Sequence, residues 1–175
     1  MKFVSETSYV GPLGLVIDVL TSPELLRARE KAAHLDHEIE FASDGVSHSF
    51  RIQVPPESIP SAARSFFPNG AKAFATATTL VHAEAGQVHG AKIPYTIDVS
   101  GAPVSGSLTF LLADGGVTTP AKISGEVNVS IPFIGGRIEK MLVERVSRIV
   151  AQDTDVVNAE IARRRGRTSY DQPAI

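Results

Sequence analysis

The sequence predicts an α+β domain in which a seven-stranded, curved antiparallel sheet wraps around a long C-terminal helix, with two short helices between the first two strands. Three observations support this fold class. Segments with alternating polar and apolar residues follow one another from about residue 35 to 131. Short glycine-bearing turns separate these segments, as they do in antiparallel hairpins. The apolar period then changes to that of a helix with one apolar and one polar side.

The first strand is expected over residues 2–10, which carry aromatic and β-branched side chains. Gly11 and Pro12 end it, because both residue types break regular strand structure. The following stretch, LGLVIDVLTSPELLRAREKA, suits two short helices. The second helix is predicted to begin at Ser22 and Pro23, because a serine hydroxyl caps a helix and proline suits the first helical position.

Six further strands are expected, and each has residues of alternating character. They are the segments LDHEIEF, VSHSFRIQV, AKAFATATTLVHA, QVHGAKIPYTIDV, VSGSLTFLLA and TPAKISGEVNVSI. In a strand, every second side chain points to the same face. In the second and fourth of these segments, the apolar face carries Val46, His48, Phe50, Ile52, Val54, His89, Ala91, Ile93, Tyr95, Ile97 and Val99. This pattern indicates a sheet that is covered on one side.

The cover is a helix expected from Gly136 to about Arg165, a length of about 43 Å at 1.5 Å per residue. One broad arc of this helix is apolar and includes Ile134, Ile138, Leu142, Val146, Ile149, Val150, Val156 and Val157. The arginines before Gly166 suit the negative end of the helix dipole, and Gly166 is expected just past that end. We therefore predict one domain over residues 1–166 and a loose tail over residues 167–175.

Composition excludes several kinds of function. The formal net charge is −2, so no long-range attraction to nucleic acid or anionic lipid is expected. Cysteine is absent, which excludes disulfides and thiolate metal sites. The longest apolar runs are shorter than the roughly 20 residues that span a bilayer, so we expect no stable membrane insertion. No basic stretch followed by an apolar one marks a signal peptide, and we interpret the protein as cytoplasmic.

No cofactor or metal site is expected either. The glycine-rich phosphate-binding patterns and the nucleophile pattern G-x-S-x-G are absent from the sequence. His34 and His37 would lie on opposite faces of a strand, and no third ligand is apparent. The basic stretch RRRGR could bind an anionic partner, although we expect it to end the helix and stay in water.

Three stretches carry a resemblance to a known family: MKFVSETSYV, LTSPELLRAREKA and, above all, GEVNVSIPFIGGRIEKMLVE. The order of elements over residues 2 to about 165 resembles the helix-grip fold of the START and birch-pollen-allergen-like (SRPBCC) superfamily, which contains polyketide cyclases. Within it, the chain looks most similar to the actinobacterial family of domain of unknown function 2505. The resemblance implies a cavity between sheet and helix that in relatives often holds an apolar molecule. It implies no catalytic residues, because that family has none agreed.

Small residues on the expected inner strands favour such a cavity, because they leave room that large side chains would fill. They are Ala71, Ala73, Ala75, Ala77, Gly90, Ala91, Gly106 and Gly125. The alternative is an alanine-rich composition with a packed core. The predicted cavity-lining residues are His48, Phe50, Ile52, His89, Ile93, Tyr95, Ile97, Ile138, Leu142, Arg145, Ile149 and Asp153.

Several of these residues are polar and have alternative explanations. Asp153 falls in the apolar arc of the helix, where a carboxylate needs a partner or a raised pKa. It could orient a ligand or act as a base, or the helix could pass the sheet edge there and leave Asp153 in water. Arg145 could meet a ligand carboxylate or extend into water. His48, His89 and Tyr95 could bind a ligand, serve acid–base chemistry, or be satisfied core residues.

The segment VPPESIPSAARSFFPNG separates the third and fourth strands, and its four prolines prevent regular strand pairing. Phe66 and Phe67 within it could form a lid over a cavity mouth or seal the core.

These observations leave three hypotheses for function. The first is a non-catalytic binding protein for a small hydrophobic or amphipathic ligand, such as a lipid, an isoprenoid or a polyketide-like compound. The second is an enzyme that cyclises, dehydrates or hydrolyses an apolar substrate with His48, Tyr95 or Asp153. The third is a protein-interaction module without a ligand. We favour the first, because no nucleophile–base pair is recognisable in the sequence.

Overall fold

The computed structural model describes residues 1–34, 37–59, 61–65, 67–84, 86–100 and 103–170. Its elements, in chain order, are β1 (Lys2–Tyr9), α1 (Leu13–Leu20), α2 (Pro23–Ala32), β2 (Ile39–Ser43), β3 (Ser47–Val54), the short 3-10 helix η1 (Pro56–Ser58), α3 (Ser61–Arg64), β4 (Ala71–Thr78), β5 (Leu80–Glu84), β6 (Gln87–Ser100), β7 (Val104–Ala113), β8 (Thr119–Val129) and α4 (Gly135–Tyr170). Among these helices, none has the length and apolar character needed to cross a bilayer.

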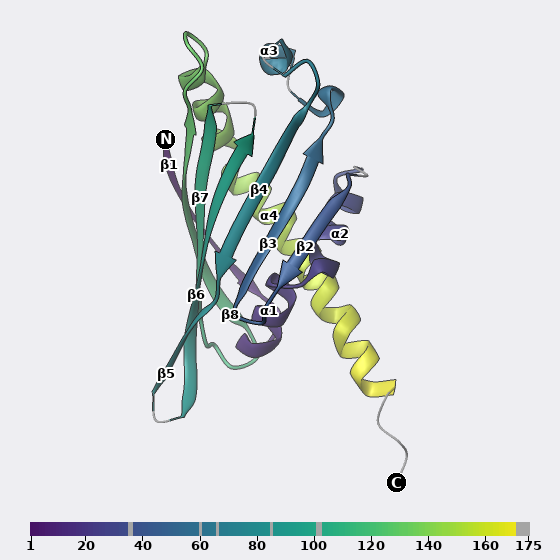
Figure 1. The fold of residues 1–175 in the computed structure, drawn as a ribbon. Coiled ribbons are helices and arrows are strands. Elements are labelled where there is room, and N and C mark those ends of the chain that lie inside the picture. The colour runs from purple at the N-terminus through teal and green to yellow at the C-terminus, as the bar shows by residue number, and fades with distance from the viewer. Residues whose placement is uncertain (35–36, 60, 66, 85, 101–102, 171–175) are drawn as a thin grey trace.

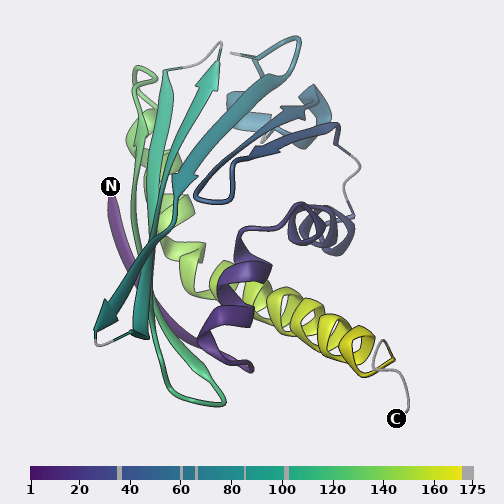
Figure 2. The same ribbon diagram turned by 60° about the horizontal axis from the view of Figure 1, so that its bottom comes forward.

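The strands form one antiparallel sheet in the order β1-β8-β7-β6-β4-β3-β2, and β5 also pairs with β6. Figures 1 and 2 show this sheet curving around α4. Helix α4 packs against β1 and β8 at one side of the sheet, and α1 and α2 pack against α4. The predicted fold class, a curved antiparallel sheet that grips a long C-terminal helix, is confirmed.

The described residues form eight strands, whereas the sequence pattern predicts seven. The additional strand arises because the predicted strand AKAFATATTLVHA is divided at Thr79. The backbone N–H of Thr79 donates to the carbonyl oxygen of Val46, 2.9 Å away, at the turn before β3. Beyond this point, β5 continues beside β6 alone.

The start of α2 follows the predicted capping arrangement. The hydroxyl oxygen of Ser22 accepts a hydrogen bond from the backbone N–H of Leu25 at 3.4 Å, and Pro23 occupies the first helical position. The same hydroxyl donates to the carbonyl oxygen of Val19 at 2.8 Å. Ser22 therefore joins the end of α1 to the start of α2 and sets the corner between them.

Two glycines, Gly135 and Gly136, stand where α4 begins after β8, and their surroundings differ. A Cβ atom at Gly135 would fall on the carbonyl oxygen of Val129, whereas the space around Gly136 is open. The N–H of Gly135 donates to the carbonyl oxygen of Ile131 at 2.9 Å, and the carboxylate of Glu139 accepts from the N–H of Val129 at 2.8 Å. The turn is therefore held from both sides, and only Gly135 is required by close approach.

The predicted end of the long helix at Gly166 is wrong, because α4 continues to Tyr170. A glycine inside a helix is unfavourable by only about 1 kcal/mol relative to alanine, so it does not by itself end one. The arginines before Gly166 pair with a side chain of the same helix: Arg163 and Arg164 both bind the carboxylate of Glu160.

The described residues form two apolar clusters in the interior. The larger one lies between α1, α2, α4 and the middle strands, and its fully buried members include Val16, Leu25, Ile93, Val157 and Ile161. The smaller one consists of Ile59, Phe67, Val129 and Ile131 at the end of the sheet near η1. Phe67 is thus packed into the core, and Phe66 lies outside the described residues.

Candidate ligand-binding site

Helix α4 is attached to the sheet along one flank. The hydroxyl groups of Thr154 and Thr7 lie 2.8 Å apart, and the side-chain oxygen of Asn158 accepts from the backbone N–H of Val10 at 2.9 Å. These contacts turn this flank of the helix toward β1. The opposite flank lies about 120° or more around the helix axis from Thr154. It carries the apolar residues Ile138, Leu142, Ile149 and Val156, which are all partly or largely exposed.

The concave face of the sheet presents a matching apolar surface. The strand registers place Phe50, Ala75, Ile97, Gly106 and Val127 side by side in one row across β3, β4, β6, β7 and β8. Phe50, Ile97 and Val127 are only half-buried, although they lie on the face that α4 covers. An apolar surface therefore remains accessible on the concave side, and the small residues Ala75 and Gly106 separate its large ones.

Two of the small residues that were expected to leave space do not do so. A Cβ atom at Gly125 would lie 2.6 Å from Cζ of Phe3, so the ring of Phe3 occupies that position. A Cβ atom at Gly90 would lie 2.7 Å from the carbonyl oxygen of Leu112 in the neighbouring strand. The hollow expected from these two glycines is wrong, because one is filled by a ring and the other permits close packing of strands.

A polar pair lies in the next row of the concave face. Nε2 of His48 and the hydroxyl of Tyr95 are 2.8 Å apart, and the two residues flank Ala77 in the register. The Tyr95 hydroxyl also donates to the carbonyl oxygen of Leu20 at 3.4 Å. Burial raises the pKa of Tyr95 to about 12 and lowers the pKa of His48 below its ordinary value, so both side chains are uncharged near neutral pH.

Aromatic rings surround this pair. The ring centroid of His48 lies 6.2 Å from that of Phe41, and the centroid of Tyr95 lies 6.4 Å from that of Phe50 and 5.9 Å from that of Phe110. We call these five residues the aromatic cluster. Its members come from β2, β3, β6 and β7, so the sheet register alone assembles it.

A groove of about 600 Å³ opens beside the aromatic cluster. It lies between the α1–α2 corner, the β2–β3 turn and the C-terminal part of α4, and its lining includes Ser22, Phe41, Val46, His48 and Thr79. Because Nε2 of His48 is bonded to Tyr95, the other ring nitrogen, Nδ1, is the one left without a hydrogen bond among the described residues. His48 therefore connects the groove to the aromatic cluster.

Asp153 has the partner that its position on an apolar arc requires. Its two carboxylate oxygens accept from Nε and Nη2 of Arg29 at 2.6 and 2.8 Å. The side chains are 23% and 30% exposed, so the pair is partly shielded from water. The alternative in which Asp153 is a free, wet carboxylate is wrong, because α2 supplies Arg29. Held in this way, Asp153 fastens α2 to α4.

The sequence pattern does not identify Tyr9 as a candidate polar residue of the site. It is fully buried at the end of β1, and its hydroxyl has no hydrogen-bond partner among the described residues. Burial, together with the Asp153 carboxylate, raises the pKa of Tyr9 far above its ordinary value. The Tyr9 hydroxyl is therefore a neutral donor held near the Arg29–Asp153 pair.

The structure brings together only part of the predicted set of lining residues. His48, Phe50, Ile93, Tyr95 and Ile97 lie on the concave face, with Ile52 in the row beyond Phe50. Ile138, Leu142 and Ile149 lie on the open flank of α4, and Ile149 is 50% exposed. Arg145 is exposed on the same helix. The inward position predicted for His89 is wrong: it is exposed, because this end of β6 extends beside β5 beyond the covered part of the sheet.

The two histidines considered for a metal site do not form one. His34 is exposed, and Nδ1 of His37 lies 3.0 Å from the carboxylate of Glu30. Across the described residues, no group of three or more histidine and acidic side chains could hold a metal ion.

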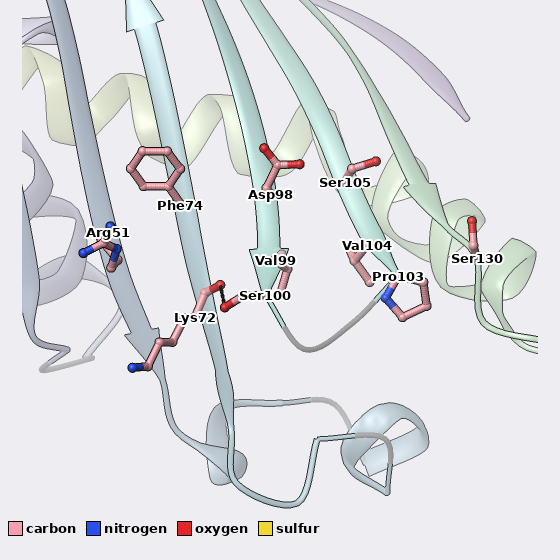
Figure 3. Close-up of a pocket in the computed structure, with 10 residues that line it drawn as sticks. All are labelled: Arg51, Lys72, Phe74, Asp98, Val99, Ser100, Pro103, Val104, Ser105 and Ser130. Atoms are coloured by element: carbon pink, nitrogen blue, oxygen red, sulfur yellow. Dashed lines mark hydrogen bonds between the residues drawn. The ribbon is translucent and has the colours of Figure 1, made fainter.

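A second hollow, of about 660 Å³, lies on the convex face, with α4 behind the sheet in this view (Figure 3). Its side chains include Arg51, Lys72, Phe74 and Asp98. The guanidinium of Arg51 lies 5.4 Å from the ring centroid of Phe74 and 2.8 Å from the carboxylate of Glu40. These residues belong to the water-facing side of the strands, and we assign no ligand to this hollow.

Exposed apolar side chains also gather on the β5–β6 hairpin and the adjacent β7. They are Leu80, Val81, Val88 and Leu111. Such a surface is what the interaction-module hypothesis expects, but nothing in the structure identifies a partner that would cover it.

The fold is that of a helix-grip protein, and both its concave sheet face and its long helix carry accessible apolar side chains. Comparison with known proteins agrees with this class. Residues 5–161 match the family described as "Protein of unknown function (DUF2505)", and the chain belongs to this family. None of the curated proteins matches the chain.

Solved structures share the fold. The chain is similar to the Zhui aromatase/cyclase from Streptomyces sp. R1128, with 14% identity, a TM-score of 0.59 and coverage of 94% of each chain. It is also similar to norcoclaurine synthase from Thalictrum flavum, with 16% identity, a TM-score of 0.58 and coverage of 93% of this chain and 86% of that one. A conserved protein from Geobacillus kaustophilus matches with 14% identity, a TM-score of 0.57 and coverage of 93% and 96%. At these identities the likeness shows the fold.

Proposed function

We propose that the protein binds a small hydrophobic or amphipathic molecule, such as a lipid, an isoprenoid or a polyketide-like compound, between the concave sheet and α4. One observation carries the proposal: the concave face of the sheet and one flank of α4 both keep apolar side chains accessible. Phe50 and Ile97 provide the sheet side, and Leu142 and Ile149 provide the helix side. Accessible apolar surface of this kind marks a binding site in soluble proteins.

Structures of the same fold support this proposal. One norcoclaurine synthase structure contains dopamine and hydroxybenzaldehyde, two small aromatic molecules. In the present chain, Phe67 closes the core at the η1 end, whereas the groove at His48 is open at the other end. We therefore expect the ligand to reach the space through the groove, in a protein that acts in the cytoplasm without a metal or cofactor.

The uncharged fluorescent probe N-phenyl-1-naphthylamine tests the proposal, because its emission rises when it enters an apolar site. We expect saturable binding to the wild type. Ile149→Glu places a charge on the open flank of α4 and should weaken binding at least about tenfold, since a buried unpaired charge is unfavourable by well over 1.4 kcal/mol. Ala151→Glu is the matched control, because it adds the same charge about 160° around the helix.

Two results would contradict the proposal. One is an absence of saturable fluorescence with the wild type. The other is equal affinity of Ile149→Glu and the wild type, provided that both variants show the melting temperature and circular dichroism spectrum of the folded chain.

A second candidate is an enzyme that cyclises, dehydrates or hydrolyses an apolar substrate in the same space. The observation that favours it is the His48–Tyr95 contact, with Nδ1 of His48 next to the groove. An uncharged imidazole could act there as a base, whereas Asp153 is held by Arg29. The hydrolytic form predicts that p-nitrophenyl laurate is cleaved by the wild type and not by His48→Gln. Equal rates for the two proteins would refute it.

A further inference from the structure

The polarity of the concave face changes along its length. Two neighbouring rows contain only apolar residues: the row of Phe50, and the row of Ile52, Ala73, Val99, Val104 and Val129. The next row toward the α1–α2 corner contains the His48–Tyr95 pair, and the groove begins there. An amphipathic molecule in this space would therefore place its apolar part toward η1 and its polar end at His48.

Of the polar atoms of the His48–Tyr95 pair, one is available to such a polar end. The Tyr95 hydroxyl is already bonded to His48 and to the carbonyl oxygen of Leu20. The single proton of the Tyr95 hydroxyl goes to Leu20, so Nε2–H of His48 donates to Tyr95, and Nδ1 of the uncharged imidazole remains as an acceptor. A ligand hydroxyl can donate to this atom, whereas a ligand carbonyl cannot.

The charges around the groove do not favour the binding of an anionic ligand. Arg163 and Arg164 both bind Glu160, and Arg164 also lies 3.3 Å from the carboxylate of Glu24. Asp18 adds a further acidic group to the lining. The groove and its surroundings thus carry two arginines and three carboxylates, so a carboxylate or phosphate entering the groove would lose its hydration without finding excess positive charge.

Arg29, another cation near this end of the core, is also paired with a carboxylate. Arg29 uses Nε and Nη2 to hold both oxygens of Asp153. The pair has no net charge, and the nearby Tyr9 hydroxyl adds a neutral donor. The polar end of the site therefore offers hydrogen bonds rather than net charge.

We infer that the ligand carries an uncharged hydroxyl group that donates a hydrogen bond to Nδ1 of His48, and that carboxylates and phosphates are discriminated against. This inference rests on the proposed function. It narrows the ligand class to alcohols with a long apolar part.

The test uses displacement of N-phenyl-1-naphthylamine at pH 7.5 by three probes of equal chain length: dodecan-1-ol, methyl dodecanoate and dodecanoate. We expect the alcohol to displace the dye at concentrations at least about tenfold below that of the carboxylate and about fivefold below that of the ester, which has no proton to donate to Nδ1. His48→Phe keeps a ring of similar size and removes the nitrogen. It should weaken the alcohol about fivefold, as expected for one hydrogen bond, with the displacement corrected for the dye affinity of the variant.

His89→Phe is the control, because the same change is made at an exposed position. Displacement by dodecanoate at the same concentration as the alcohol overturns the inference, and so does an unchanged alcohol affinity in a folded His48→Phe. If His48→Phe does not fold, the alcohol-to-carboxylate ratio of the wild type decides alone. Failure of the dye itself to bind the wild type would instead overturn the proposed function.

Discussion

The Arg29–Asp153 pair is predicted to stabilise the attachment of α2 to α4, and a double-mutant cycle measures that contribution. Asp153→Asn and Arg29→Met each remove one charge while keeping most of the side-chain volume. The pair forms two charge-assisted hydrogen bonds of 2.6 and 2.8 Å. Hydrogen bonds to charged groups contribute about 1.5–3 kcal/mol when shielded, and exposed ion pairs about 0–1 kcal/mol. With side chains 30% and 23% exposed, we expect a coupling energy of about 1–2 kcal/mol.

The assay is urea unfolding followed by circular dichroism for the wild type, both single variants and the double variant. The double variant should lose less stability than the sum of the losses of the two single variants, because each single variant leaves one charged partner uncompensated. The Lys140–Glu144 pair on the same helix is the control: its atoms are 3.8 Å apart and its side chains 71% and 64% exposed. A coupling energy for Arg29–Asp153 no larger than that of this exposed pair would refute the reasoning.

Two further predictions concern the β8–α4 junction and the buried histidine. Gly135→Ala should destabilise the fold by several kcal/mol or prevent folding, because its Cβ would fall on a backbone carbonyl of β8, whereas Gly136→Ala should leave stability unchanged or raise it by up to about 1 kcal/mol in thermal unfolding. The pKa of His48 is lowered by burial beside Tyr95, so below its ordinary value of 6.5 the unfolded chain takes up a proton that the folded chain resists. The free energy of unfolding should therefore fall as pH drops below 6.5, by at most about 1.4 kcal/mol per pH unit from this group. His48→Gln should remove this part of the pH dependence and His89→Gln should retain it; identical pH profiles for the two variants would contradict the assignment.

The fold could be predicted because its signals are local. Alternating polarity, glycine-bearing turns, the capping serine of α2 and the amphipathic period of α4 each involve residues close in sequence. The fold prediction errs in two places. Thr79 bonds to Val46, which is distant in the sequence, and this contact divides a predicted strand. Helix α4 continues past Gly166, because a single glycine does not by itself end a helix.

The site could be predicted only in part, because it depends on which strands become neighbours. Period two correctly places His48 and Tyr95 on the inner face, but their meeting at 2.8 Å follows from the register of β3, β4 and β6. The same rule fails for His89, since alternation continues along β6 after the cover ends. Arg29 gives no signal in the sequence, because the partner of a charged helix residue is decided by the packing of α2 on α4.

The position of α4 links stability to the proposed function. Polar contacts such as Thr7–Thr154 hold the helix at the β1 side, and Phe3 fills the space above Gly125 there. On the other side, Ile149 and the half-buried Phe50 retain contact with water, so the fold forgoes about 25 cal/mol for every Å² of apolar surface left uncovered. A ligand that covers this surface recovers that free energy without moving the helix. The asymmetric grip is thus less stable than a fully packed layer would be, and the difference is available for binding.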